Sequence, residues 1–229
     1  MALSTFSARI NDLIGTFSDT NAMDTFLLDG LKELLSVLPP NKLAECTTTT
    51  TLSNSPTTLD LDTATIGPVM SVVRKDTQGY NQICRPIPSM MSSRVTNPED
   101  LMHATATDPV YFINNAVLNV YPDPTASQTA DIVYVPLPTH VDSTTDKIDN
   151  IPNEYEYVIV LYAAIKCAQA LLAEEEDEEL YVPIINTLKQ DYVQSLNLLG
   201  ANLKPAKGAS RRAPNPFEGM QMSQQQGQE

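Results

Sequence analysis

The sequence predicts an α+β fold in which N- and C-terminal helices form an antiparallel helical bundle, an antiparallel β domain is inserted between them, and an extended C-terminal arm follows. Three observations lead to this fold class. Apolar residues recur at helical spacing near both ends of the chain, in residues 6–38 and 153–199. Residues 47–138 are instead rich in Thr, Val, Ile, Tyr and Pro, which are strand and turn residues. From Lys204 onward hydrophobic residues are few and Pro, Ser, Gly and Gln are common, a composition that we expect to be disordered in isolation.

These changes in composition divide the chain into four expected parts. They are an N-terminal helical hairpin over residues 1–45, an inserted β-rich domain over 46–145, a C-terminal helical pair that completes the bundle over 146–203, and an extended arm over 204–229. A chain of 229 residues buries about 70% of its unfolded surface on folding, so its stability needs no metal or disulfide.

Two helices are predicted at the N-terminus. The first has an apolar face formed by Phe6, Ile10, Leu13, Ile14 and Phe17. The second covers about residues 22–37, with Asn21 as its N-cap and Pro39-Pro40 ending it. Its apolar residues, again at helical spacing, are Met23, Phe26, Leu27, Leu31, Leu34, Leu35 and Leu38.

Seven strands are predicted in the inserted region, separated by turn sequences such as Asn-Ser-Pro and Thr-Gln-Gly. Their short spacing suits antiparallel meanders rather than βαβ units. A single helical turn is expected at residues 97–102, because Pro98 suits the first helical position and the acids after it favour the positive helix end. The candidate strands are residues 47–52, 57–61, 68–76, 82–87, 110–113, 116–121 and 130–136.

The helix that begins near Asn153 is apolar on nearly every side. Between residues 157 and 172 its only charge is Lys166, and such a helix needs cover on all its faces. We expect neighbouring subunits to supply part of that cover. The residues assigned to subunit packing are Tyr157, Ile159, Leu161, Tyr162 and Ile165.

An acidic run follows this helix and is predicted to hold the turn to a last helix. Six consecutive acids lack the spaced ligands and turn glycine of a dedicated calcium loop. In an assembly they would either keep phosphates from adhering to a channel or guide the docking of a basic partner, and the sequence leaves both open. The run comprises Glu174, Glu175, Glu176, Asp177, Glu178 and Glu179.

The last helix has an apolar face and a glycine cap. Gly200 is suited to the cap, and Pro183 either begins the helix or kinks it. The apolar face holds Ile184 or Ile185, Leu188, Tyr192, Leu196 and Leu199.

The net charge of −14 argues against a general nucleic-acid binder, because Lys and Arg make the phosphate contacts that dominate such affinity. The charge is uneven, since residues 204–229 hold four basic and two acidic side chains. This segment either is an inert solvated terminus or is an arm that folds onto a partner, combining charge with apolar anchors. The residues of the candidate arm are Lys204, Lys207, Arg211, Arg212, Phe217, Met220 and Met222.

Cysteine usage and the longest apolar run indicate a soluble protein in a reducing compartment. Cys46, Cys84 and Cys167 lie far apart and lack Cys-x-x-Cys spacing, so we expect free thiols. The first 17 residues lack the pattern of a signal peptide. The longest apolar run, residues 157–172, is shorter than a comfortable membrane span, so no membrane partner is expected.

Motifs for catalysis or cofactor binding are absent from the sequence. It has no Gly-x-Ser-x-Gly, no Walker loop and no Gly-x-Gly-x-x-Gly, and His103 and His140 lie on separate predicted loops without ligand spacing. We therefore expect no enzyme, no cofactor and no metal. Glu154 and Glu156 are the best acid pair for a hydrolase, but the positive end of a helix explains both.

Taken in order, several segments resemble the head-to-tail adaptor (connector, neck) proteins of tailed bacteriophages. The similarity spans about residues 4–199 and begins with the helical hairpin. The segments are Gly67-Pro68-Val69-Met70-Ser71-Val72-Val73-Arg74, Asp108-Pro109-Val110-Tyr111-Phe112, the turn Val120-Tyr121-Pro122-Asp123-Pro124, and Ile151-Pro152-Asn153-Glu154-Tyr155 before the apolar helix.

The resemblance implies a structural virion protein, made in the host cytoplasm and placed at the head-tail junction. It implies a homo-oligomeric ring of twelve copies that joins the portal protein to tail or nozzle proteins and surrounds part of the channel through which genomic DNA passes without specific binding. It also implies that the arm from Lys204 onward docks along the portal. The alternatives are a tail-terminator or tail-tube subunit and, from another class, a virion-associated hydrolase.

Overall fold

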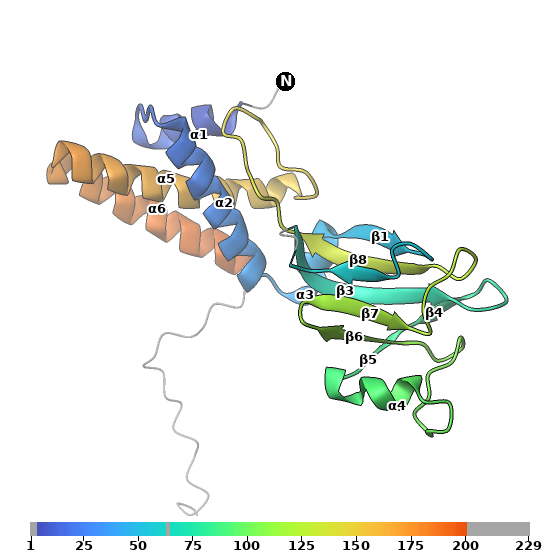
Figure 1. Cartoon of the computed structure of the whole chain (residues 1–229). Helices are drawn as coiled ribbons and strands as arrows, with labels where there is room; N and C mark the ends of the chain where they lie inside the picture. The colour runs from blue at the N-terminus through green and yellow to red at the C-terminus, as the bar shows by residue number, and fades with distance from the viewer. Residues whose placement is uncertain (1–3, 63–64, 201–229) are drawn as a thin grey trace, which may run out of the picture.

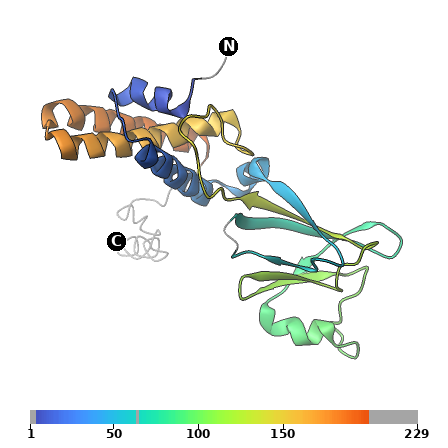
Figure 2. The same cartoon turned by 45° about the horizontal axis from the view of Figure 1, so that its top comes forward.

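A computed structural model describes residues 4–62 and 65–200, and within them the protein is mixed α+β, with six α-helices and two four-stranded sheets. Four helices (α1, α2, α5 and α6, here the helical part) lie at one end and the two sheets (the sheet part) at the other, as Figures 1 and 2 show. The helices are α1 (Phe6–Ile14), α2 (Thr20–Val37), α3 (Pro40–Leu43), α4 (Ser92–Thr96), α5 (Asn153–Glu175) and α6 (Glu178–Leu198). The strands are β1 (Thr48–Leu52), β2 (Thr58–Asp60), β3 (Ile66–Lys75), β4 (Asn81–Ile83), β5 (Arg85–Pro86), β6 (Val110–Asn114), β7 (Val117–Tyr121) and β8 (Ala130–Pro136).

Helices α1 and α2 both begin at a side-chain cap. The Thr5 hydroxyl accepts a hydrogen bond from the Ala8 amide at 3.3 Å, and the Asp19 carboxylate accepts one from the Ala22 amide at 3.0 Å. The predicted cap at Asn21 is wrong, because Asp19 caps equally well and starts α2 at Thr20. The predicted end before the two prolines is confirmed.

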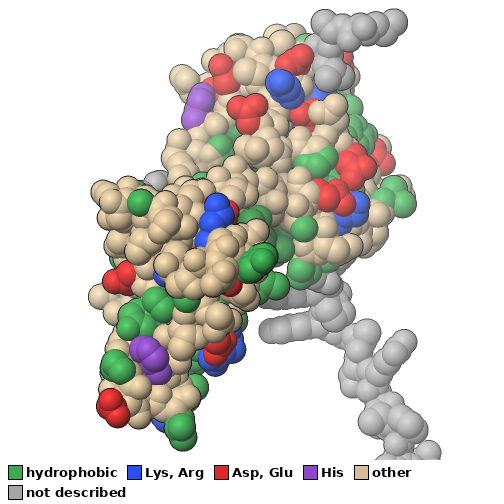
Figure 3. Space-filling view, turned by 90° about the vertical axis from the view of Figure 1, so that its right-hand side faces the viewer, with side chains coloured by type: hydrophobic (Ala, Val, Ile, Leu, Met, Phe, Trp, Pro, Cys, Tyr) green, Lys and Arg blue, Asp and Glu red, His purple; other side chains and the backbone are tan. Residues whose placement is uncertain are grey.

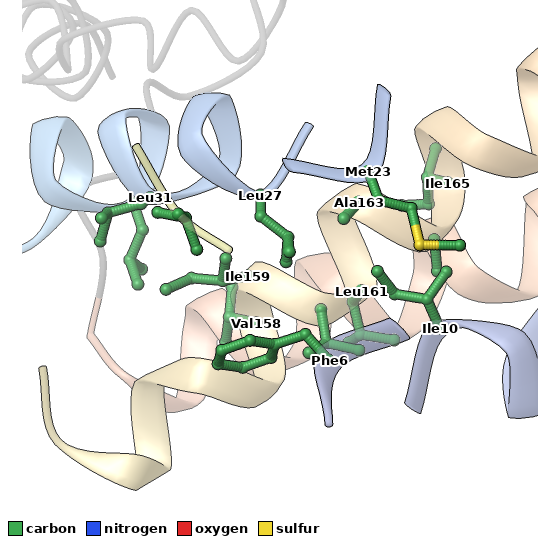
Figure 4. Packing of buried hydrophobic residues seen from close by; sticks show 14 of the residues in the cluster. Phe6, Ile10, Met23, Leu27, Leu31, Val158, Ile159, Leu161, Ala163 and Ile165 are labelled. Atoms are coloured by element: carbon green, nitrogen blue, oxygen red, sulfur yellow. The ribbon is translucent and has the colours of Figure 1, made fainter. Parts of the chain in front are cut away.

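Helix α5 is covered by three other helices of the same chain, since α1, α2 and α6 all contact it. In Figure 4, side chains of α1 and α2 converge on those of α5. Val158, Ile159, Val160 and Leu161 are consecutive and all buried. Because successive residues of an α-helix point about 100° apart, four consecutive buried positions mean cover on every side.

This cover explains the composition of α5 without a membrane. Among the described residues, α5 is the one helix that is long and apolar enough to cross a bilayer, yet most of its residues are buried inside the protein. Such burial is the arrangement of a core helix in a folded protein. The close approach of α2 requires Gly30, because a Cβ there would lie 2.9 Å from the Tyr162 ring.

The acidic turn between α5 and α6 is confirmed. Glu176 adopts a left-handed conformation with φ of 55°, and the Asp177 carboxylate caps α6 by accepting from the Leu180 amide at 3.1 Å. Helix α6 starts before Pro183, which therefore lies inside the helix and does not begin it. Gly200 follows the helix with φ of 71°, as its predicted capping role requires.

The two sheets pack into one apolar cluster. Their strand orders are β1-β8-β3-β4 and β2-β7-β6-β5. Every predicted strand is present, but the segment 82–87 forms two strands, β4 and β5, in different sheets. The residues buried between the sheets are Leu52, Val72, Cys84, Leu118, Val120, Ala130 and Ile132.

The expected all-antiparallel arrangement is wrong at one pair, because β5 pairs with β6 in parallel. The chain crosses between the sheets at the buried Cys84 and then makes a long excursion through α4 before β6. A connection of that length is what a parallel pair needs.

The predicted helical turn at 97–102 is also displaced. Helix α4 ends at Thr96, and the side chains of Asn97 and Asp100 accept hydrogen bonds from the amides two residues ahead, which organises tight turns instead. Pro98 disfavours helical backbone at Asn97, and this effect outweighs the suitability of Pro98 for a first helical position.

A buried arginine holds the loop between β7 and β8. Arg74 is 2% exposed, and its guanidinium donates to the carbonyls of Lys75 and Asp123 and to the side chain of Gln128, at 3.0–3.1 Å. Burial lowers the pKa of Arg74, and the three acceptors offset part of the cost of its desolvation.

The stability of the protein should depend on the burial of α5. Leu161→Ala removes a fully buried side chain and leaves a cavity, so we expect the free energy of unfolding to fall by about 2–5 kcal/mol. Leu198→Ala, the same change at an 88% exposed helix position, should change it by less than about 0.5 kcal/mol. Urea unfolding of both variants measures the difference, and similar losses would contradict the central place of α5.

Candidate interaction surfaces

The connecting segment, residues 137–152 between β8 and α5, is tied to the start of α1. The amides of Phe6 and Ser7 donate to the carbonyls of Thr145 and Ser143 at 2.9 and 2.8 Å. The first amides of a helix have no partner within the helix, so these bonds satisfy two of them. On the other side, the Ser143 amide donates to the Asp24 carboxylate of α2 at 2.7 Å.

Glu156, in the first turn of α5, binds both α1 and the connecting segment at the junction where these three segments meet. Its side chain is 2% exposed, and its carboxylate accepts from the Arg9 guanidinium and from the Ile148 amide, both at 3.2 Å. The guanidinium also lies over the Phe6 ring at 5.3 Å. Glu156 therefore links α1, the connecting segment and α5, a role that the sequence analysis missed. An acid within an apolar helix, with one arginine in a distant amphipathic helix, was the available signal.

A second polar cluster joins the start of α5 to α3. The Tyr155 hydroxyl donates to the Glu45 carboxylate at 2.5 Å, and Lys42 pairs with Glu45 at 3.1 Å and with Glu154 at 3.5 Å. Burial raises the pKa of Tyr155, and the hydrogen bond to Glu45 adds to that shift. The hydrogen bond from Tyr155 lowers the pKa of Glu45, and the bond from Lys42 adds to it.

The two acids considered for hydrolysis thus bind different partners. Glu154 is 57% exposed and pairs with Lys42, whereas Glu156 is enclosed and pairs with Arg9. Two carboxylates engaged on different sides of a helix do not converge on one reacting atom, as paired acid catalysis requires. Among the described residues no group of three His, Cys, Asp or Glu side chains could hold a metal ion.

The histidines and cysteines lie apart from one another. His103 packs edge-on against Tyr121 and its Nδ1 lies 3.1 Å from the Val95 carbonyl, while His140 is exposed beside Asp24. The three cysteines are free, as predicted, and the structure shows that all three are buried. Burial raises the pKa of Cys46 to about 11 and the pKa of Cys84 and Cys167 to about 12, so all three are neutral thiols near pH 7.

The residues predicted for subunit packing separate into two groups. Ile159, Leu161 and Ile165 are buried in the core of their own chain, so their side chains are not available to a neighbour. Tyr162 is half-buried against α2 and α6, and Tyr157 is 46% exposed. Helices α1, α2 and α6 supply cover for these three side chains within the chain, which leaves Tyr157 and Tyr162 as the proposed subunit-packing residues with exposed surface.

The outer face of α6 is a surface that the sequence analysis did not identify. Val182 and Val193 are 40% and 47% exposed, and a shallow groove beside them is lined by Asn186, Lys189 and Gln190. Val182, Asn186, Lys189 and Val193 are three or four residues apart in succession, so they form one stripe along the helix. Exposed Leu180 and Leu198 lie beyond the two ends of this stripe.

The six acids of the turn between α5 and α6 are all exposed. Two of them have local structural roles, since the Glu175 carboxylate accepts from the Tyr181 hydroxyl at 2.7 Å and Asp177 caps α6. The other four present negative charge at the far end of the helical part from the sheets, as the joint of α5 and α6 in Figure 1 shows. The arm residues from Lys204 to Met222 lie outside the described part of the chain.

Four large apolar side chains are exposed on separate turns and strands of the sheet part. The exposed residues are Tyr80 at 69%, Ile83 at 79%, Met90 at 84% and Leu101 at 104%. Hydrophobic side chains are visible on the lower lobe in Figure 3. Asp76 stiffens the hairpin that holds Tyr80, because its carboxylate accepts from the amides of residues 78 and 80. Exposed apolar side chains mark protein-binding sites where they form a contiguous patch, so these four residues are candidates for a contact with another protein.

Glu156 should contribute far more to stability than Glu154. Glu156→Ala leaves the Arg9 guanidinium without its carboxylate and the buried Ile148 amide without an acceptor, so we expect a loss of about 3 kcal/mol in the free energy of unfolding. Glu154→Ala removes an exposed pair and should cost less than about 1 kcal/mol.

Urea unfolding of the two variants tests this difference. Equal losses would show that the Arg9–Glu156 pair does not hold the junction.

Comparison with known proteins gave one match that covers most of the chain. The family model described as SU10 adaptor protein matches residues 1–216. A search of the curated proteins found no match.

Proposed function

The chain belongs to the SU10 adaptor protein family, a family of phage head-to-tail adaptors, and from this premise we propose that it forms the ring that joins the portal to the tail. Membership makes the protein a structural component of the phage virion at the head-tail junction, where it interacts with portal and tail. The family is one of structural adaptors and not of enzymes. The match over residues 1–216 is the observation that carries the proposal.

We place the helical part in the ring as an antiparallel bundle, with the sheet part as an insertion that faces the tail. Ring closure requires two different contact faces on each subunit. The α6 stripe (Val182, Asn186, Lys189 and Val193) supplies exposed apolar side chains at Val182 and Val193 for one of these faces, and Tyr157 is a further exposed side chain on α5. The exposed apolar side chains of the sheet part, with Tyr80 on a hydrogen-bonded hairpin, support a contact with a tail or nozzle protein. We propose a ring of twelve copies, as the resemblance implies.

The acidic turn between α5 and α6 supports two roles in such a ring. Facing the channel, its carboxylates would repel the DNA phosphates and keep the genome sliding during packaging and ejection. Facing a basic partner, they would guide docking. The exposure of all six residues is compatible with either role.

The arm from Lys204 to Glu229 is proposed to dock along the portal. Its four basic residues and its Phe217, Met220 and Met222 provide charge and apolar anchors on a segment without other hydrophobic clusters. The proposed parts of the chain remain residues 1–45, 46–145, 146–203 and 204–229.

A tail-terminator or tail-tube subunit is the second candidate function. Such proteins are expected to be dominated by β structure, whereas here the largest apolar core belongs to the helices. A virion hydrolase is disfavoured by the separate partners of Glu154 and Glu156.

A reconstruction of the virion tests the proposal directly. We expect the protein directly below the portal, as a closed ring whose copies contact one another through the outer face of α6. Location in the capsid or along the tail tube would contradict the adaptor role, whereas a ring of another copy number would correct the stoichiometry alone.

Deletion of residues 204–229 should weaken portal binding at least about tenfold, because the proposed charge and anchors are removed together. Deletion of residues 223–229 is the matched control, since it removes part of the same terminus without any basic or apolar anchor. Binding to purified portal rings, measured by biolayer interferometry, compares the three chains. Unchanged binding after the longer deletion would refute the proposed arm.

A further inference from the structure

A groove of about 510 Å³ lies along the connecting segment, between the end of β8 and the start of α5. This volume is within the range of cavities that bind ligands. The rim carries Asp142, Asp146 and Asp149, with Lys147 and His140 as its basic side chains. The apolar residues of the lining are Pro136, Leu137, Pro138, Val141 and Ile148.

The carboxylates of the rim are available to a cationic ligand. The hydroxyl and amide of Thr144 hydrogen-bond to Asp142 and lower its pKa, so this carboxyl is ionised near pH 7. The side chains of Asp146 and Asp149 form no hydrogen bond or ion pair with another described residue. An apolar floor with an acidic rim fits a peptide that carries both basic residues and an apolar anchor.

The course of the last two helices brings the end of α6 back to the end of the helical part where the groove lies. Helix α5 starts directly after the groove residues and runs away from the sheets, and α6 returns beside it. The two helices have 23 and 21 residues, or about 34 and 32 Å at 1.5 Å per residue. The end of α6 therefore lies at the same end of the helical part as the start of α5, as Figure 1 shows.

The sequence after Gly200 has the matching chemistry. Lys204, Lys207, Arg211 and Arg212 come first, and Phe217 follows within a proline-containing stretch. The 17 residues from Gly200 to Phe217 span up to about 56 Å at about 3.3 Å per residue, which is ample for a site at the near end of the helical part.

We propose that residues 204–217 dock in this groove of their own chain in the free subunit, with the basic side chains on the rim and Phe217 on the apolar floor. A short tether within one chain gives an effective concentration in the millimolar range, so weak contacts suffice. The inference goes beyond the proposed function and does not depend on portal binding. If both hold, the groove and the portal compete for the same residues, and the portal must displace the arm from the groove.

Disulfide trapping in the full-length chain tests the docking. The native cysteines are buried, so introduced exposed cysteines react selectively. The test pair is Lys147→Cys in the groove with Asn215→Cys in the segment, which leaves Phe217 in place. The control pair combines Asn186→Cys, on the outer face of α6, with the same Asn215→Cys. We expect the intramolecular disulfide of the test pair to form at least about tenfold faster than that of the control pair.

Charge reversal distinguishes specific binding of the basic segment to the acidic groove from random collision of the two cysteines. Asp146→Lys with Asp149→Lys should slow the test pair to the rate of the control pair, and adding Arg211→Glu with Arg212→Glu should restore the faster rate. The thermal unfolding midpoint of each variant checks that the fold is intact.

Three outcomes would overturn the proposal. They are equal rates for the test and control pairs, a rate that does not respond to charge reversal, and disulfide-linked dimers as the main product when the single-cysteine chains are mixed. The last outcome would place the segment on a second copy. None of these measurements involves the portal, so failure here leaves the proposed function standing.

Discussion

Cover for α5 is the constraint on which the rest of the molecule depends. Its middle turns are buried in every direction, so three other helices must reach it from different sides. Helix α1 does so from the N-terminus, α2 makes a close approach at Gly30, and α6 returns along it after a two-residue turn. Burying an apolar side chain contributes about 1.5–3 kcal/mol, so this one helix organises much of the stability of the helical part.

The first turn of α5 fixes the two links between the helical part and the sheet part. Glu156 ties the helix to α1 and to the connecting segment, and Tyr155 ties it to Glu45 in the link between α2 and β1. The chain passes between the helical part and the sheet part twice, from α2 to β1 and from β8 to α5. The first turn of α5 therefore holds both of these connections. A virion adaptor must keep two partners in a defined relation, and such a junction suits that task.

The sequence predicted the chemical types of the candidate surfaces, but not always the residues that form them. The acidic turn was predicted where it occurs, because six consecutive charges cannot be buried. The subunit-packing residues were assigned to α5, yet Ile159, Leu161 and Ile165 face their own chain. Apolar periodicity reports that a side chain is covered and not what covers it, so the exposed stripe on α6 was found only in the structure.

The sequence by itself determined the order and type of the four long helices and of most strands, from the helical spacing of Phe6, Ile10 and Ile14 to the threonine-rich first strand and the αL glycine after α6. Those signals are local, since they depend on neighbours within one or two turns. Only the tertiary structure decided the parallel pairing of β5 with β6, the partner of Glu156 and the groove beside the connecting segment. The strand pair and the Arg9–Glu156 contact join residues far apart in the chain, and the groove brings Thr65 beside residues 136–150. Such contacts depend on three-dimensional packing, which no local pattern encodes.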